Sequence, residues 1–149
     1  MKELSRIASA AQASTTMAID SMFKQMKADG IDVIGFAAGE PDFNTPDEIK
    51  EAGIAAIINN NTRYTPARGT VELRQAVCDR MKADCGVEYV PNQVVVASGA
   101  KHAVYIALRA IVNPGDEVIL PAPYWVSYIE LIKMMGGVPV VVTATEEEH

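Results

Sequence analysis

The sequence predicts an α/β fold, in which short parallel strands alternate with amphipathic helices. Residues 94–97 (Val-Val-Val-Ala) and 117–120 (Glu-Val-Ile-Leu) are short apolar runs bounded by turn residues, as is typical of buried strands. Residues 138–142 (Val-Pro-Val-Val-Val) form a third run of this kind. Helical patterns separate the three runs, so we expect right-handed crossovers and parallel pairing.

The N-terminal segment is expected to contain an arm, a helix and a strand. Residues 1–13 are small and polar without a strong period, which indicates an arm. Thr15 or Thr16 can cap the helix that follows, and Gly30 can end it. Residues 33–37 predict a short strand. The apolar face expected for the helix consists of Ile19, Phe23 and Met26.

Two further helices are expected in the middle of the chain. Thr45, Pro46 and Glu48 supply the cap, first-turn proline and third-position glutamate of a helix start. The second helix is expected from about Thr70 to about Cys85, with Gly86 as its terminator. Its expected apolar face consists of Leu73, Val77 and Met81.

Helices are also expected between the three apolar runs. Residues 101–112 repeat apolar side chains at helical spacing, and residues 128–135 form a second helix that stops at Gly136. The apolar positions of the first of these helices are Val104, Leu108 and Ile111.

The composition indicates a globular protein and gives no sign of a nucleic-acid or membrane partner. Hydrophobic residues make up 49% and charged residues 21%, which argues against disorder. The net charge is −6 and no basic cluster occurs, so nucleic acid and anionic membranes are poor candidate partners. No apolar run approaches the roughly 20 residues of a membrane span, and the N-terminal residues do not resemble a secretory signal. The expected location is therefore the cytoplasm.

The two cysteines give no sign of a disulfide or a metal site. Cys78 and Cys85 lie seven residues apart in one predicted helix, a rise of about 10 Å that is too long for a disulfide. Neither has a Cys-x-x-Cys partner or a neighbouring histidine, so we expect two reduced cysteines and no bound metal.

Residues 98–102 (Ser-Gly-Ala-Lys-His) join a predicted strand to a predicted helix and form a candidate anion site. The first N–H groups of a helix have no partner within it, and the helix dipole is positive at that end. Together with the ammonium group of Lys101, these groups suit a phosphate. An ordinary turn with a small residue for close packing accounts for the same residues about as well.

Three further segments, in chain order, resemble one enzyme family. They are residues 39–43 (Gly-Glu-Pro-Asp-Phe), residues 64–69 (Tyr-Thr-Pro-Ala-Arg-Gly) and residues 121–128 (Pro-Ala-Pro-Tyr-Trp-Val-Ser-Tyr). With residues 98–102, they are similar to the motifs of class I aminotransferases, enzymes that use pyridoxal 5′-phosphate (PLP). The likeness is greatest to bacterial aspartate aminotransferases.

The resemblance implies a fold and a division of the chain. The family's large domain is a three-layer αβα structure, and residues 46–149 would supply part of this PLP-binding domain with an incomplete sheet. Residues 1–45 would form the N-terminal arm and a segment of the small domain. The sequence is thus expected to be the N-terminal portion only. It ends before the lysine that forms the Schiff base with PLP, so no catalytic residue is assigned and the 149-residue chain itself is expected to be inactive.

The resemblance also implies residues that bind the cofactor. Ser98, Gly99 and Ala100 would hold the PLP phosphate, and Trp125 would stack on the cofactor ring beside the substrate. The hydroxyl group of Tyr64 would reach the phosphate of the partner subunit, in a homodimer with shared active sites. Core packing for Trp125 and a packed loop position for Tyr64 are the structural alternatives.

The implied substrate residues point to an acidic amino acid. The backbone of Gly39 would contact the substrate carboxylate, and Thr16 and Lys101 would form a pocket for the distal carboxylate of aspartate. Lys101 could instead be a cation beside the phosphate. The implied reaction moves an amino group between L-aspartate and 2-oxoglutarate. The alternatives are an aminotransferase for aromatic or other amino acids, and a non-catalytic fragment that dimerises or binds a phosphate ligand.

Overall fold

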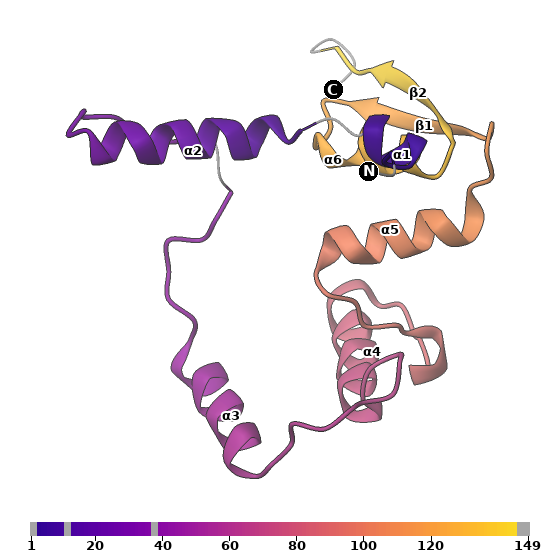
Figure 1. Ribbon diagram of the computed structural model, residues 1–149. Coiled ribbons are helices and arrows are strands. Elements are labelled where there is room, and N and C mark those ends of the chain that lie inside the picture. Colours follow the sequence, from indigo (N-terminus) through magenta and orange to yellow (C-terminus); the bar gives the residue numbers. More distant parts are fainter. Residues whose placement is uncertain (1–2, 11–12, 37–38, 146–149) are drawn as a thin grey trace. The chain divides into compact units, whose positions relative to one another are not determined.

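A computed structural model describes residues 3–10, 13–36 and 39–145 of the chain. The chain divides into two compact units (Figure 1). The first unit consists of Met1–Glu40 and Val104–His149, and the second of Pro41–Ala103. The predicted division at residue 45 stays a prediction.

Two helices form the N-terminal part of the first unit. The segment expected to be an arm contains a short helix, α1 (Arg6–Ala10). Ser5 Oγ accepts the N–H of Ala8 at 3.2 Å and so caps the start of this helix. The small, polar residues of this segment gave no helical period from which the helix could be predicted. Helix α2 (Thr15–Ala28) begins where expected, but its cap is Ser14, whose Oγ accepts the N–H of Met17 at 3.3 Å. The prediction of Thr15 or Thr16 as the cap is therefore wrong by one or two residues.

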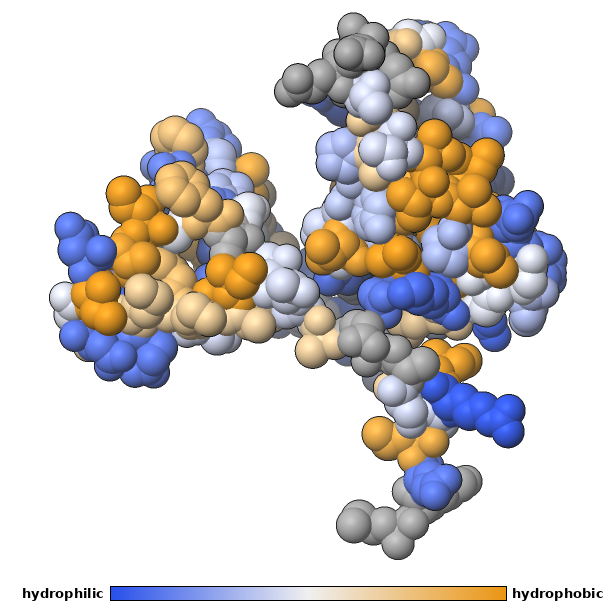
Figure 2. All heavy atoms as spheres, turned by 90° about the horizontal axis from the view of Figure 1, so that it is seen from above, coloured by the Kyte–Doolittle hydropathy of each residue, from blue (hydrophilic) through white to orange (hydrophobic). Residues whose placement is uncertain are grey.

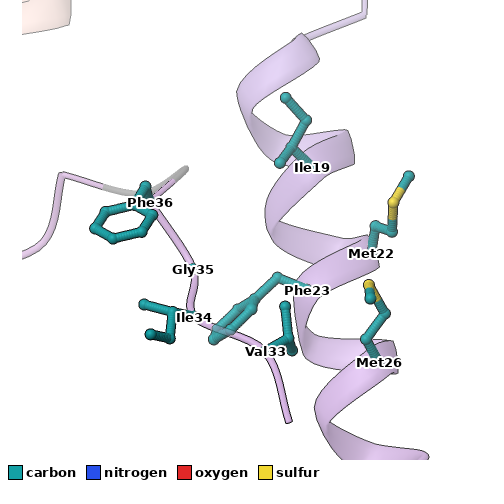
Figure 3. Close-up of a pocket in the computed structure, with 8 residues that line it drawn as sticks. All are labelled: Ile19, Met22, Phe23, Met26, Val33, Ile34, Gly35 and Phe36. Carbon is teal, nitrogen blue, oxygen red and sulfur yellow. The ribbon is translucent and has the colours of Figure 1, made fainter. Parts of the chain in front are cut away.

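The expected apolar face of α2 lies against the extended residues 33–36 (Figure 3). Phe23 and Met26 are half-buried there. A Cβ atom at Gly35 would lie 2.9 Å from the ring of Phe23, so glycine allows the close approach of the two segments. Residues 33–36 are not a strand, because no backbone hydrogen bond in the described part of the chain joins them to another strand. Ala37, the last residue of that predicted strand, lies outside the described residues.

The sheet of the first unit has two parallel strands, β1 (Glu117–Ala122) and β2 (Val138–Thr143). Their register pairs Glu117 with Val138 and Ala122 with Thr143. Helix α6 (Ser127–Met134) connects them, as the predicted crossover requires. Both predicted strands and their parallel pairing are confirmed. The hydrophobic core beneath this sheet consists of Leu120, Leu131, Ile132 and Met135.

The second unit contains helices α3 (Asp47–Ile58) and α4 (Val71–Cys85). The cap position of α3 is Pro46 rather than Thr45, and no side chain caps it, because Pro46 has no side-chain acceptor. The residues predicted to begin and end α4 do so. Thr70 Oγ1 accepts the N–H of Leu73 at 3.3 Å, and Gly86 ends the helix with a φ of 69°.

The buried face of α4 is rotated by one residue from the prediction. Arg74 and Cys78 are buried, whereas Leu73 and Val77 are exposed. Met81, the third predicted position, is half-buried. The i, i+4 spacing of a buried stripe is thus kept, but a charged residue and a cysteine occupy it. Cys78 and Cys85 are both free thiols, as expected.

The third strand predicted at residues 94–97 is wrong. These residues follow a short 3₁₀ helix, η1 (Pro91–Gln93), and are extended but not part of a sheet. The N–H of Val96 donates to the carbonyl of Arg68 at 3.0 Å, a single bond to a loop rather than a strand ladder. Helix α5 (Ala100–Ile111) follows as predicted. Val104 and Leu108 are half-buried on it.

Many large apolar side chains reach the surface of the described residues (Figure 2). Phe36 is 91% exposed and Phe43 87% exposed, although buried phenylalanines are the rule in folded proteins. Within residues 3–10, 13–36 and 39–145, no helix is long and apolar enough to cross a membrane.

Candidate functional site

The Ser98–Gly99 turn leads directly into the N-terminus of α5. Gly99 has a φ of 82°, which side chains other than glycine rarely adopt, and its N–H donates to the carbonyl of Ala97 at 2.8 Å. The N–H of Ala103 makes the first i to i−4 bond of the helix, to Gly99 at 3.1 Å. A Cβ atom at Gly99 would meet nothing within 4 Å, so the space around it is open. The N–H of Gly99 is thus engaged within the turn, and an anion bound here would meet the helix N-terminus that follows it.

His102 stabilises this turn. The N–H of Ser98 donates to Nδ1 of His102 at 3.2 Å. The ring nitrogen accepts this hydrogen bond only while it carries no proton, so the contact belongs to the neutral imidazole. His102 thus acts on the shape of the turn.

Tyr64 lies in the loop before α4, and its side chain is fully exposed. This exposure does not support a packed loop position within its own unit. The loop ends at Gly69, where φ is 92° and the N–H donates to the carbonyl of Pro66 at 2.8 Å. The Tyr64 ring is therefore presented outward from an anchored loop.

Trp125 follows β1, at the carboxyl end of the parallel sheet, where α/β folds bind ligands. It is 44% exposed, so it is not a core residue. Its ring packs edge-on against the ring of Tyr128, with centroids 5.5 Å apart and planes at 87°. This contact restrains the indole beside the N-terminus of α6.

The remaining predicted residues are accessible to a ligand. Gly39 is exposed, and a Cβ atom there would meet nothing within 4 Å. Thr16 is half-buried on the first turn of α2. Lys101 is exposed on the first turn of α5.

The predicted residues are divided between the two units. Thr16, Gly39 and Trp125 belong to the first unit. Five predicted residues belong to the second unit, namely Tyr64, Ser98, Gly99, Ala100 and Lys101. The last four are consecutive and lie at the start of α5. The pairing of Thr16 with Lys101 stays a prediction.

Reading the sequence missed Arg74. Its side chain is 7% exposed and donates to the carbonyls of Gly69 at 3.2 Å and Pro91 at 2.7 Å. The one available signal was its spacing from Cys78 and Met81 at i, i+4 and i+7. In the part of the chain that the structure describes, no group of three or more His, Cys, Asp or Glu side chains could hold a metal ion.

Residues 31–149 match the family described as aminotransferase class I and II. The chain belongs to this family. The aspartate aminotransferase of Bacillus sp. (strain YM-2) is 52% identical over 136 residues, which are 91% of this chain and 35% of that protein. The aspartate aminotransferase of Bacillus subtilis is 47% identical over 147 residues, 99% of this chain and 37% of the relative.

A solved structure gives the same assignment. The aspartate aminotransferase of Thermus thermophilus with maleate superimposes with a TM-score of 0.95 at 39% identity, over 99% of this chain and 39% of that one. The predicted family and α/β fold are confirmed, and the cofactor of the family is PLP, as predicted. The chain spans little more than a third of the length of these relatives.

Proposed function

We propose that this chain forms the phosphate-binding part of a PLP-dependent aminotransferase that moves an amino group between L-aspartate and 2-oxoglutarate. The observation that carries the proposal is the Ser98–Gly99 turn at the start of α5. Its positive φ and open surroundings leave room for a phosphate group at the helix N-terminus, where the helix dipole favours an anion. The relatives named aspartate aminotransferase support the reaction.

Each residue would have a distinct task. Ser98, Gly99 and Ala100 would hold the cofactor phosphate, and Trp125 would orient the ring by stacking. Bound PLP supplies an electron sink for bond cleavage at the substrate α-carbon. The backbone of Gly39 would hold the substrate carboxylate, since no side chain blocks its approach.

The preference for an acidic substrate rests on Lys101 and Thr16. An ammonium group and a hydroxyl group together suit a carboxylate. The Thermus thermophilus relative was solved with maleate, a dicarboxylate with four carbons like aspartate. This supports a dicarboxylate as the substrate class.

The assembly and location are part of the same proposal. Tyr64 would act in the partner subunit of a homodimer, which its outward exposure permits. Residues 1–45 and 46–149 would belong to the small and large domains. A cytoplasmic location stays a prediction, as does the inactivity of the 149-residue chain alone.

A pair of glycine variants tests the phosphate turn in the full-length protein. Gly99→Ala and Gly53→Ala each add a methyl group where a Cβ atom meets nothing within 4 Å, but only Gly99 has a positive φ. We expect Gly99→Ala to weaken PLP binding by about tenfold or more, because a displaced N–H group loses a charged hydrogen bond of about 1.5–3 kcal/mol. Gly53→Ala in α3 should bind PLP normally.

The readouts are PLP titration of the apoprotein and the formation of oxaloacetate from aspartate, with 2-oxoglutarate as the amino acceptor that becomes glutamate. Tyrosine and alanine as donors separate the aspartate proposal from its alternatives. The 149-residue chain is assayed beside the full-length variants, and we expect it to show no aspartate turnover. Unchanged PLP affinity in a folded Gly99→Ala protein would contradict the assignment of the turn.

A further inference from the structure

Two segments of the second unit that carry candidate phosphate contacts meet at a junction. One is the end of the Tyr64 loop at Arg68 and Gly69, and the other is residues 91–97, which lead to Ser98. The N–H of Val96 donates to the carbonyl of Arg68 at 3.0 Å. The Arg68 Nη1 group donates to the carbonyl of Asn92 at 3.1 Å.

The junction is also tightly packed. A Cβ atom at Gly69 would lie 2.7 Å from Cγ2 of Val96, closer than real Cβ contacts. The φ of 92° at Gly69 excludes other residues independently of this crowding. The Tyr64 loop and the segment before Ser98 therefore fit each other in one arrangement.

Arg74 connects the two sides of this junction from the first turns of α4. Its Nε group donates to the carbonyl of Gly69 at 3.2 Å, and its Nη1 group donates to the carbonyl of Pro91 at 2.7 Å. One planar guanidinium group thus holds both segments at once. Gly69 lies five residues after Tyr64, and Pro91 lies seven residues before Ser98.

The environment of Arg74 is unusual for a charged residue. It is 7% exposed, and among the described residues it forms no ion pair with a carboxylate. Burying a charge without a counterion is costly, so such a group persists where its hydrogen bonds are needed. Both of its partners are backbone carbonyls of the junction, which explains why an arginine occupies an otherwise apolar stripe.

We propose that Arg74 is a positioning residue for phosphate contacts, which fixes the Ser98–Gly99–Ala100 turn for the cofactor of its own subunit and the Tyr64 loop for the cofactor of the partner subunit. The inference rests on the proposed function. Arg74 does not touch the phosphate. It acts by holding the carbonyls of Gly69 and Pro91 with the two arms of its guanidinium group, a geometry that a lysine ammonium group cannot reproduce.

The test compares Arg74→Met and Arg74→Lys with Arg80→Met in the full-length protein. Arg80 lies on the same helix, is exposed and pairs with Asp84. Dissociation constants of PLP and of pyridoxal, which lacks the phosphate, are measured on each apoprotein. We expect Arg74→Met to bind PLP about tenfold or more weakly with pyridoxal binding within about twofold, because only contacts with the phosphate are displaced. The discrimination between the two ligands is the ratio of the dissociation constant of pyridoxal to that of PLP. This ratio should fall in part in Arg74→Lys and stay unchanged in Arg80→Met.

Amide hydrogen exchange of the apoprotein supplies a readout that needs no ligand. The amides of Gly69 and Val96 should exchange about tenfold faster in Arg74→Met, while those of β1 and α6 keep their protection. If Arg74→Met does not fold, Arg74→Lys decides: wild-type exchange together with full discrimination in that variant would overturn the proposal. A folded Arg74→Met protein that still discriminates PLP from pyridoxal would overturn it as well. A wild-type protein that does not discriminate the two ligands would instead refute the proposed function.

Discussion

Lys101 occupies a position at which an anionic ligand would be attracted twice, by the ammonium group and by the helix N-terminus. It lies in the first turn of α5, one residue after the helix begins at Ala100. The positive end of the helix dipole disfavours a lysine there. A negatively charged ligand reverses this effect, since the ammonium group and the helix N-terminus then attract the same group. Both the phosphate and the distal carboxylate of the substrate are anions of this kind.

Substitution of Lys101 by alanine distinguishes these two anions. If Lys101 binds the distal carboxylate, kcat/KM for aspartate should fall about 10- to 100-fold, the worth of a charged hydrogen bond, while that for tyrosine changes little. Lys82→Ala is the matched control, because Lys82 is exposed and pairs with Glu88 on the surface. Steady-state kinetics with both donors measure the effect. Equal losses for aspartate and tyrosine would place Lys101 beside the phosphate.

Single residues show what the sequence could indicate. Gly99 was selected because residues 98–102 join a predicted strand to a predicted helix and resemble a family motif, and its role at the phosphate stays a prediction. Arg74 was missed because arginine is ordinarily exposed, and the search for an apolar face selected Leu73 and Val77 instead. Its burial depends on the carbonyls of Gly69 and Pro91, which come from other segments. No local pattern encodes that contact.

For helices and strands too, features set by neighbouring residues were predicted, whereas features set by distant segments were not. The ends of α4 were predicted correctly because Thr70 and Gly86 act within one turn of the helix. The strand expected at residues 94–97, and the described residues 33–36 of the strand expected at 33–37, were wrong because a strand exists only when another segment pairs with it. Runs of β-branched residues indicate the extended backbone but not the partner. β1 and β2 form a sheet because α6 returns the chain to a parallel neighbour.

The cap of α4 gives a prediction at this scale. Thr70→Ala removes the acceptor for the N–H of Leu73, so the full-length protein should lose about 1 kcal/mol of unfolding free energy. Thr62→Ala, at an exposed loop position, should change it by less than about 0.5 kcal/mol. Urea denaturation followed by circular dichroism measures both values. Equal effects of the two substitutions would mean that the cap contributes nothing to stability.

At the scale of the whole molecule, the ordered motifs identified the family, because four short segments in one order are far more specific than any one of them. The motifs could not predict which apolar side chains are buried in this chain and which are exposed. Phe36 and Phe43 are almost fully exposed in this chain, and the relatives are more than twice as long. Among the described residues few apolar side chains are buried, so they gain little hydrophobic stabilisation from one another.

The exposed Tyr64 gives a prediction about the proposed homodimer. If the Tyr64 of one subunit serves the cofactor of the other, Tyr64→Phe should weaken PLP binding without unfolding the protein, since its side chain is fully exposed. Trp125→Ala should impair the site of its own subunit. A dimer with one subunit of each kind then has one site with both native residues and one site with neither.

Mixing the two variants after dissociation therefore tests the shared site. Random pairing makes about half of the dimers mixed, each with one native site, so activity should rise toward about a quarter of the wild-type value. The assay is aspartate turnover at limiting PLP, with subunit exchange followed by native mass spectrometry. Each variant carried alone through the same dissociation is the control. If the subunits exchange and activity stays at the average of the two variants, Tyr64 serves its own subunit, because every mixed dimer then carries one defect in each site.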